Sequence, residues 1–333
     1  MVKKVLIIVQ LVVILVLAGY FIYQKPEEKS FARSSVALLE EKEKQFNHIQ
    51  PPQKFLTFDV PEDLNLAGER VPLDDMEVLQ RLDRELHVNT YWNSNTIFLM
   101  KRSSQWFPHM AKILEENGIP NDFQYLPLIE SGLLNVKSPA GALGFWQFME
   151  HTARELGLEV NDEVDERYDP IRSTEAACKY LKQAFNKFGN WTNVVASYNM
   201  GMAGMHRSMM EQKVDSYYDL LLNDETSRYV FRLLAIKEIM ENPGKYGYDI
   251  PEKHLYKQEP LKEIKIDTSI PDLVDFALNQ GINYKILKQY NPWLRKKSLT
   301  IKQKGKSYTL LLPQHSFNLK ELAKSSRNSN SLN

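Results

Sequence analysis

The sequence is poor in several features that mark common functional classes. It has one cysteine, Cys178, in 333 residues, which excludes an internal disulfide and a zinc cluster built on cysteines. Its 42 basic side chains balance 42 acidic ones, so the basic excess typical of nucleic-acid-binding proteins is missing. The sequence contains no glycine-rich phosphate loop, and its seven histidines show no metal-binding spacing. We therefore predict no cofactor, no metal ion and no nucleic-acid partner.

A long apolar run is present at the N-terminus. Two lysines precede Val5–Tyr23, which is broken only by Gln10 and Gly19. A helix of this length spans about 28 Å, close to the hydrocarbon thickness of a bilayer, and the lysines would stay in the cytoplasm. We expect a membrane anchor over residues 1–24, with a cleaved signal peptide as the alternative because Val16–Ala18 resembles a cleavage site. Either way, the bulk of the chain is expected in the cell envelope, in the periplasm or otherwise outside the cytoplasm.

The middle of the chain has mainly helical patterns. Residues 25–60 are rich in Lys, Glu, Gln and Pro and are predicted to be a tether. The clearest apolar stripe predicts a helix over 173–188 with Ser173 as its cap, and a last long helix is predicted over 224–241. Pro108 is expected to begin another helix, since proline is favoured in the first turn. Strand alternation is scarce before residue 250, which indicates a mainly α fold.

Beyond Pro251 the pattern changes to a small α+β module, which we place at 251–315. It predicts a strand, two helices and a strand, in the order Leu255–Ile266, Ile270–Asn279, Tyr284–Tyr290 and Tyr308–Leu312. The Ser/Asn-rich tail at 316–333 is predicted to be disordered.

One glutamate stands out because of its neighbours. Glu130 ends the apolar run Phe123–Ile129, where its carboxyl group would be poorly hydrated. Desolvation penalises the charged form and raises the carboxyl pKa toward neutrality, as a general acid requires. A single Glu at the exposed end of a buried helix would give the same pattern, so the rest of the sequence has to decide.

Four groups of residues together resemble the catalytic domain of lytic transglycosylases, the goose-lysozyme-like (SLT) enzymes that cut bacterial peptidoglycan. In chain order they are Glu130-Ser131, Ser138–Gln147, Tyr198-Asn199, and Glu225-Thr226 with Tyr229. The resemblance covers roughly residues 95–245 and is greatest to the membrane-bound D-type branch, because of Trp146. It implies a lysozyme-like helical catalytic domain, which we place at 61–250.

The resemblance also implies roles for particular residues. Glu130 would be catalytic, and the substrate-binding residues would be Ser131, Gly144, Trp146, Gln147, Tyr198, Asn199, Glu225 and Tyr229. Some of these have simpler interpretations: Ser131 as a helix C-terminal cap, Trp146 as a core residue, and Glu225 as a favourable charge near a helix N-terminus.

The predicted activity follows from the same resemblance. The partner would be peptidoglycan glycan strands, cut between N-acetylmuramic acid and N-acetylglucosamine with formation of a 1,6-anhydro ring. A goose-type muramidase that uses water, or a non-catalytic wall-binding protein, are the alternatives. Residues Pro271–Ala277 and Lys288–Pro292 resemble a LysM-type glycan-binding module, although a structural appendage without glycan contact is the other interpretation.

Overall fold

The computed structural model describes residues 11–17, 19–20 and 56–314. Residues 11–17 and 19–20, inside the predicted anchor, are helical, whereas the rest of that segment, nearly all of the tether and the tail at 316–333 lie outside the described residues. None of the helices within these ranges is both long and apolar enough to cross a membrane. The chain divides after Thr57, and everything described below belongs to the compact unit that begins at Phe58.

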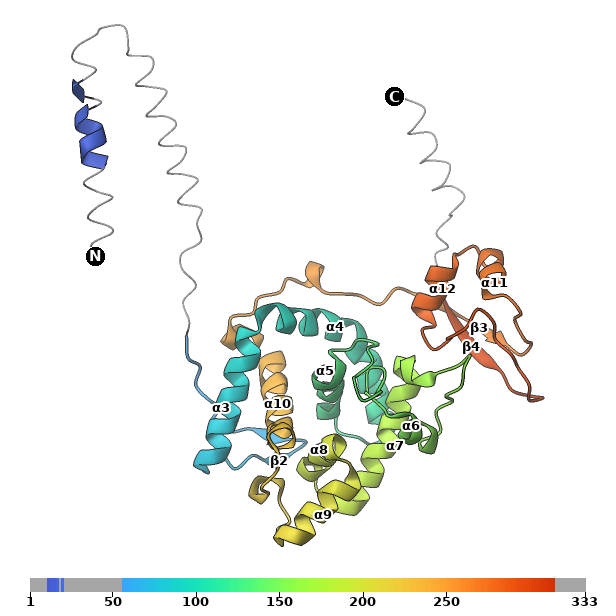
Figure 1. Cartoon of the computed structure of the whole chain (residues 1–333), viewed down its shortest axis with the longest axis horizontal. Helices are drawn as coiled ribbons and strands as arrows, with labels where there is room; N and C mark the ends of the chain where they lie inside the picture. Colours follow the sequence, from blue (N-terminus) through green and yellow to red (C-terminus); the bar gives the residue numbers. More distant parts are fainter. Residues whose placement is uncertain (1–10, 18, 21–55, 315–333) are drawn as a thin grey trace. The chain divides into compact units, whose positions relative to one another are not determined.

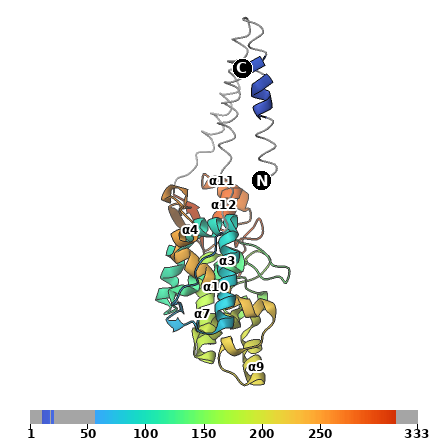
Figure 2. The ribbon, with the colours of Figure 1, turned by 90° about the vertical axis from the view of Figure 1, so that its left-hand side faces the viewer.

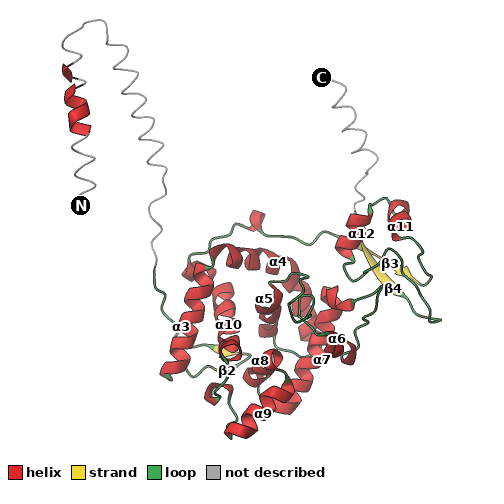
Figure 3. Ribbon diagram, in the orientation of Figure 1, coloured by secondary structure: helices red, strands yellow, loops and turns green. Residues whose placement is uncertain are grey.

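This unit is mainly helical, as the sequence predicts (Figure 1; Figure 3). Its helices up to residue 250 are α3 Met76–Tyr91, α4 Asn93–Glu116, α5 Leu126–Ser131, α6 Glu150–Glu155, α7 Pro170–Phe188, α8 Trp191–Met200, α9 Met202–Gln212 and α10 Asp224–Glu241. Shorter 3-10 turns are η2 Asn121–Tyr125, η3 Glu166–Tyr168, η4 Tyr217–Asp219, η5 Pro243–Tyr246 and η6 Glu252–His254. A small antiparallel hairpin, β1 Asn65–Leu66 with β2 Glu69–Arg70, precedes the helices.

Two predicted helix starts are wrong, each for a physical reason. Helix α7 begins at Pro170, where the Asp169 side chain accepts hydrogen bonds from the first free backbone N–H groups. Ser173 is therefore inside the helix, and its hydroxyl donates to the Asp169 carbonyl oxygen at 2.6 Å. Pro108 also lies inside a helix, α4, because buried side chains before and after it, Leu99 and Met110, keep one face packed. The bounds of the last long helix, α10, are confirmed.

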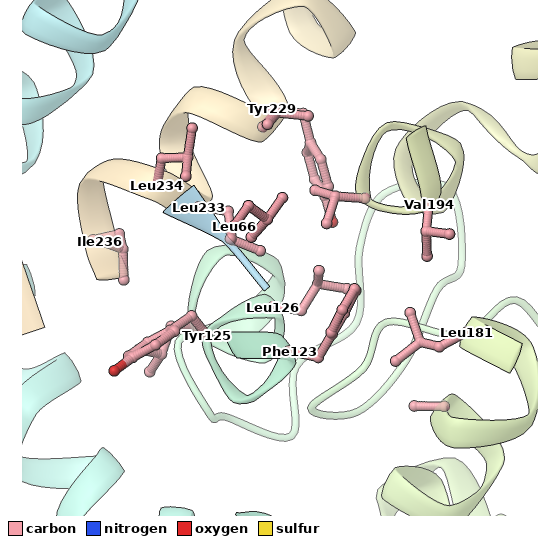
Figure 4. Close-up of a cluster of buried hydrophobic side chains, with 14 of the residues drawn as sticks. Leu66, Phe123, Tyr125, Leu126, Leu181, Val194, Tyr229, Leu233, Leu234 and Ile236 are labelled. Atoms are coloured by element: carbon pink, nitrogen blue, oxygen red, sulfur yellow. The ribbon is translucent and has the colours of Figure 1, made fainter. Parts of the chain in front are cut away.

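Helix α10 lies at the centre of the packing. It runs beside α3 and also contacts α5 and α8, so that most of its length is covered (Figure 1; Figure 2). Figure 4 shows side chains from α5, α7, α8, α10 and η2 gathered in one cluster, among them Phe123, Leu126, Leu181, Val194 and Tyr229. Burial of such large apolar side chains is worth roughly 1.5–3 kcal/mol each. This cluster holds α5 and α10 together, and these two helices carry four of the predicted site residues, Glu130, Ser131, Glu225 and Tyr229.

The C-terminal part has its own hydrophobic cluster. It consists of β3 Leu261–Ile266, α11 Leu273–Asn279, α12 Tyr284–Tyr290 and β4 Tyr308–Pro313, and β3 pairs antiparallel with β4 in the register Leu261 to Pro313. The predicted order of a strand, two helices and a strand is confirmed. Val164, which lies far outside this segment in sequence, is 1% exposed and is part of its core.

Candidate active site

Glu130 lies in the last turn of a short helix. Pro127 is in the first turn of α5, and Gly132 ends the helix in the left-handed conformation with φ 62°. Leu126 and Leu128 are buried and fix the helix against the hydrophobic core, while Glu130 itself is half-buried at the end of the helix. The apolar run in the sequence thus places one carboxyl group at the edge of the core.

The environment of Glu130 raises its pKa to about 7 from an ordinary value of 4.5. Burial is the largest cause, and the negative charge of Glu225 acts in the same direction. A hydrogen bond from Tyr229 and the positive charge of Arg232 act against it by stabilising the carboxylate. A carboxyl group with a pKa near neutrality can both donate and accept a proton, which is the property expected of a general acid that later acts as a base.

Two tyrosines border this carboxyl group, but only one bonds it. The Tyr229 hydroxyl donates to Glu130 Oε1 from the neighbouring helix α10, and Tyr229 is 2% exposed. The Tyr198 hydroxyl donates instead to the Trp146 carbonyl oxygen at 2.7 Å. Burial raises the pKa of Tyr198 well above its ordinary value, and the charge of Glu130 adds to this effect. The tyrosine that orients the carboxyl group is therefore Tyr229.

Ser131 holds a loop and makes no bond to Glu130. Its hydroxyl lies 2.8 Å from the Phe145 carbonyl oxygen and 3.2 Å from that of Pro127. The first contact fastens residues 142–148, which we call the active-site loop, to the end of α5. Ser131 therefore joins the active-site loop to α5, and capping of the last turn is only part of what it does. Its contact with substrate stays a prediction.

Within the active-site loop, Gly144 is needed for packing against protein. Its φ is +80°, and a Cβ atom added there would lie 1.8 Å from the Arg167 carbonyl oxygen. The resemblance implies that Gly144 binds substrate, but the space beside its Cα atom is filled by the backbone of Arg167.

The structure contradicts the predicted contact between Trp146 and a sugar. Its side chain is fully buried, and its indole Nε1 donates to Thr174 Oγ1 at 2.9 Å. The alternative interpretation as a core residue is the correct one. An indole with a satisfied N–H inside the core cannot stack on a glycan.

Gln147 is held by its amide nitrogen. Nε2 donates to the Gly144 carbonyl oxygen at 2.7 Å and to that of Val136 at 3.1 Å. The backbone of Gln147 has a φ of 49°, a left-handed conformation that is uncommon for a residue with a side chain. The side chain is half-buried, which leaves the predicted contact with substrate open to its amide oxygen.

Asn199 and Glu225 form the opposite border of the site. Asn199 Nδ2 donates to Glu225 Oε1 at 3.3 Å, and its Oδ1 accepts from Thr226 Oγ1 at 2.8 Å. Glu225 is exposed in the first turn of α10, while Tyr229, one turn later, is buried. Asn199 and Glu225 meet because α8 and α10 pack together, and Glu225 is near enough to Glu130 for its negative charge to raise the pKa of that carboxyl group.

Sequence reasoning missed three residues. Arg232, whose guanidinium donates to the Ile129 carbonyl oxygen at 3.1 Å, lies three positions after Tyr229, so helical spacing places both on one face. Thr174 and Arg167 support the active-site loop from a distance in sequence, and no local pattern marks them.

A cavity of about 650 Å³ lies between α4, η2 and the C-terminal end of α10, and its lining includes Phe107, Tyr125 and Met240. None of the predicted site residues lines it. Over the described residues no cluster of three or more metal-ligating side chains is found. Cys178 is buried, and burial raises the pKa of its thiol to about 11, which disfavours the reactive thiolate.

Two segments of the chain match known protein families. Residues 110–220 match the family model described as transglycosylase SLT domain, and residues 262–316 match the one described as soluble lytic transglycosylase C-terminal LysM-like domain. The chain therefore carries an SLT domain, with Glu130 inside it, followed by a LysM-like domain.

Its similarity to individual proteins agrees with these domains. It is 26% identical over 257 residues to the membrane-bound lytic murein transglycosylase D of Escherichia coli (strain K12), covering 75% of this chain and 55% of the relative. A putative tributyltin chloride resistance protein from Alteromonas sp. (strain M-1) is 26% identical over 114 residues, covering 34% of this chain and 55% of that protein. The chain thus spans about half the length of the curated relatives it matches.

A similarity to a solved structure is also found. It is an inactive mutant of the lytic transglycosylase Slt from Pseudomonas aeruginosa, with 18% identity, a TM-score of 0.33, and coverage of 45% of this chain and 25% of that one.

Proposed function

We propose that this protein is a peptidoglycan lytic transglycosylase that cleaves the β-1,4 bond between N-acetylmuramic acid and N-acetylglucosamine. The observation that carries the proposal is Glu130, a half-buried carboxyl group with a pKa of about 7, held by Tyr229 inside the SLT domain. Such a group is protonated about half the time near neutral pH, so it can serve as an acid without a second titrating partner.

The proposed reaction needs one carboxyl group. Glu130 protonates the glycosidic oxygen as the C1–O bond breaks, and N-acetylglucosamine leaves with a free hydroxyl group. The N-acetyl carbonyl of the muramyl sugar stabilises the positive charge that develops at C1. Glu130, now a carboxylate, removes the proton from the C6 hydroxyl of the same sugar, and that oxygen closes the 1,6-anhydro ring on C1. Protons balance, and no water is consumed.

The neighbours of Glu130 have separate roles in this proposal. Tyr229 orients the carboxyl group, and Arg232 together with the Tyr229 hydroxyl limits how far its pKa rises. Glu225 is exposed and paired with Asn199; its negative charge raises the pKa of Glu130, and it borders the substrate. Ser131, Gly144 and Tyr198 act through the active-site loop, whose Gln147 amide oxygen is the group offered to the sugar.

An intramolecular nucleophile explains why ring closure should outrun hydrolysis. Well-oriented groups within one molecule reach effective concentrations of ~10⁵ M or more, far above that of water. The test is mass analysis of the fragments released from purified peptidoglycan. They should end in 1,6-anhydro-N-acetylmuramic acid, lighter by one water than a hydrolysed end and resistant to borohydride. Reducible ends would identify a muramidase instead, and no release at all would identify a binding protein.

The domain organisation and location are part of the proposal. We assign 1–24 to a membrane anchor, 25–60 to a tether, 61–250 to the catalytic domain, 251–315 to the LysM-like module and 316–333 to a tail. The apolar run after two lysines and the similarity to a membrane-bound relative support an address in the cell envelope. N-terminal sequencing of the mature protein tests the anchor: a start at Met1 or Val2 supports it, and a start near Gly19 means that a signal peptide was removed.

A further inference from the structure

A short hairpin of the SLT domain contacts both the LysM-like module and the active-site loop. It comprises residues 158–168, which we call the docking hairpin, closed by a bridge between Val160 and Asp165 and by a hydrogen bond from Glu166 N to the Glu159 carbonyl oxygen at 2.9 Å. Nothing in the proposed chemistry requires this hairpin.

On one side, the docking hairpin completes the core of the module. Val164, 1% exposed, packs into the cluster of Leu294 and Leu310 and pairs with Leu294 as in a strand. Backbone hydrogen bonds run from Asp165 N to the Trp293 carbonyl oxygen at 2.9 Å and from Arg295 N to that of Glu163 at 2.7 Å. The module therefore uses a residue of the SLT domain as one of its own core residues.

Charged groups strengthen the same contact. The Glu163 carboxylate accepts hydrogen bonds from Ser298 and from Thr300 N at 2.8 Å, and these bonds lower the pKa of Glu163. The Arg295 guanidinium lies 3.9 Å from the centre of the Tyr168 ring, a cation–π contact. Lys306 Nζ lies 2.6 Å from Glu159 Oε2. These charged groups come from both the docking hairpin and the LysM-like module. They fix the position of one on the other, in addition to the apolar packing of Val164.

On the other side, the docking hairpin supports the active-site loop. The Arg167 carbonyl oxygen occupies the space where Gly144 lacks a side chain, and Arg167 Nη1 lies 3.4 Å from the Phe148 carbonyl oxygen. Arg167 is itself fixed by a buried ion pair with Asp165, with Nη2 to Oδ2 at 2.8 Å. Asp165 thus bonds the module through its backbone N–H and holds Arg167 through its carboxylate.

The active-site loop in turn carries the contacts next to the acid. Its Trp146 carbonyl oxygen accepts from Tyr198, and its Phe145 carbonyl oxygen accepts from Ser131, the residue that follows Glu130. A continuous chain of contacts therefore runs from the module through Asp165 and Arg167 to the loop beside Glu130. A chain of packed groups of this kind is a physical route for coupling, and mutations along it are the way to test it.

We propose that the LysM-like module is a positioning element for the active site: docked on residues 158–168, it holds Arg167 against Gly144 and so orders the active-site loop beside Glu130. This inference rests on the proposed function, to which it adds a role for the module. It favours the module as a structural partner of the SLT domain over an independent glycan binder joined by a linker.

The test is a pair of matched double variants in the full chain. Glu163→Ala with Arg295→Ala removes a carboxylate and a cation from the docking contact. Glu263→Ala with Lys265→Ala removes the same two charges from exposed positions of β3. Both pairs leave every residue of the candidate active site unchanged, so a difference between them reports on docking.

Hydrogen exchange gives a readout that does not depend on activity. In the docking variant, exchange should be faster at the amides of Asp165 and Arg295, which bond across the contact, and also at Leu143 and Phe148, which bond each other within the active-site loop. In the β3 variant all four amides should exchange as in the wild type. Faster exchange across the contact with unchanged Leu143 and Phe148 would overturn the inference.

Kinetics on soluble glycan strands provide the second readout. The docking variant should lose roughly tenfold to a hundredfold in kcat with little change in KM, since misplacement by about 1 Å can cost that much. A looser loop also lets water reach Glu130, which lowers the pKa of its carboxyl group. The loss of activity on the alkaline side should therefore occur at lower pH in the docking variant than in the wild type. Unchanged kcat with weaker sedimentation on insoluble peptidoglycan would show that the module is a binder and contradict the inference. A wild type that releases no anhydro ends would refute the proposed function alone, and the exchange result would still decide the coupling.

Discussion

The hydroxyl of Tyr229 donates a hydrogen bond to Glu130 Oε1, although 99 residues separate the two in the chain. Both groups lie at the edge of the core, where burial raises the pKa of the carboxyl group to about 7 and that of the phenol well above its ordinary value. The phenol therefore stays protonated and acts as a fixed donor. It orients the carboxyl group and stabilises its charged form.

Loss of this bond should shift the pH dependence of activity. In Tyr229→Phe the carboxylate loses a donor, so the pKa of Glu130 should rise above about 7 and the alkaline loss of activity should occur at higher pH. The rate at its optimum should fall about tenfold, because the carboxyl group is less well oriented. The measurement is kcat against pH on soluble glycan strands.

Tyr125→Phe is the matched control for that experiment. Tyr125 also pairs with a glutamate, Glu241, at 3.1 Å, but both residues lie away from the candidate site. Its pH profile should match that of the wild type. An unshifted profile in Tyr229→Phe would mean that Glu130 does not set the alkaline limb.

Replacement of the acid should remove activity and add stability above neutral pH. Glu130→Gln keeps the shape of the side chain but cannot donate the proton, so lysis of purified wall should fall by roughly 10²–10⁴-fold. The folded pKa of about 7 lies above the ordinary 4.5, so the folded state binds more protons in that interval and loses stability as pH rises through it. This loss is at most on the order of 3 kcal/mol.

Urea unfolding at two pH values tests the stability part. Glu130→Gln should be more stable than the wild type at pH 8 and about equally stable near pH 4, whereas Glu115→Gln, at an exposed position of α4, should follow the wild type. Near-normal lysis by Glu130→Gln would end its assignment as the acid. Equal stability at both pH values would show that its carboxyl group is not held in a desolvated site.

Some of the site was predictable from sequence, and the limits are physical. The bounds of α10 followed from helical spacing, which is a local signal. The apolar run made Glu130 only a candidate, and its assignment as the acid rested on the four groups of residues that resemble lytic transglycosylases. The buried position of Trp146 could not be predicted, because Trp146 lies in a loop where no periodicity distinguishes buried from exposed side chains. Arg167 was missed because its fit to Gly144 depends on backbone segments brought together only by folding. Val164 was missed for the same reason, since its core lies more than a hundred residues later.

Trp146 should affect stability and leave substrate affinity unchanged. Trp146→Phe loses the hydrogen bond to Thr174 and leaves a space in the core, so the free energy of unfolding should fall by about 2–4 kcal/mol. Thr174→Val leaves the indole N–H buried without its acceptor and should cost about 1–3 kcal/mol. Denaturant unfolding and KM are measured together for both variants. A large rise in KM for Trp146→Phe with unchanged stability would restore the sugar-stacking interpretation.

Two glycines near each other in sequence offer a final, sharper comparison. Gly141 and Gly144 both have positive φ, +92° and +80°, so a side chain at either position is strained. At Gly141 an added Cβ meets nothing within 4 Å, whereas at Gly144 it would lie 1.8 Å from the Arg167 carbonyl oxygen. Gly141→Ala should therefore cost only the conformational strain, roughly 1–2 kcal/mol, and should keep most of its activity.

Gly144→Ala has to move backbone, because the overlap is with a carbonyl group of the docking hairpin and not with the end of a flexible side chain. It should cost at least about 3 kcal/mol and should lower kcat by more than its loss of folded protein explains, since the loop that bonds Tyr198 and Ser131 is displaced. Unfolding curves give the fraction of folded protein, and kcat divided by that fraction gives the activity of each folded molecule. Equal effects at the two glycines would mean that the close approach of Arg167 has no part in holding the active-site loop.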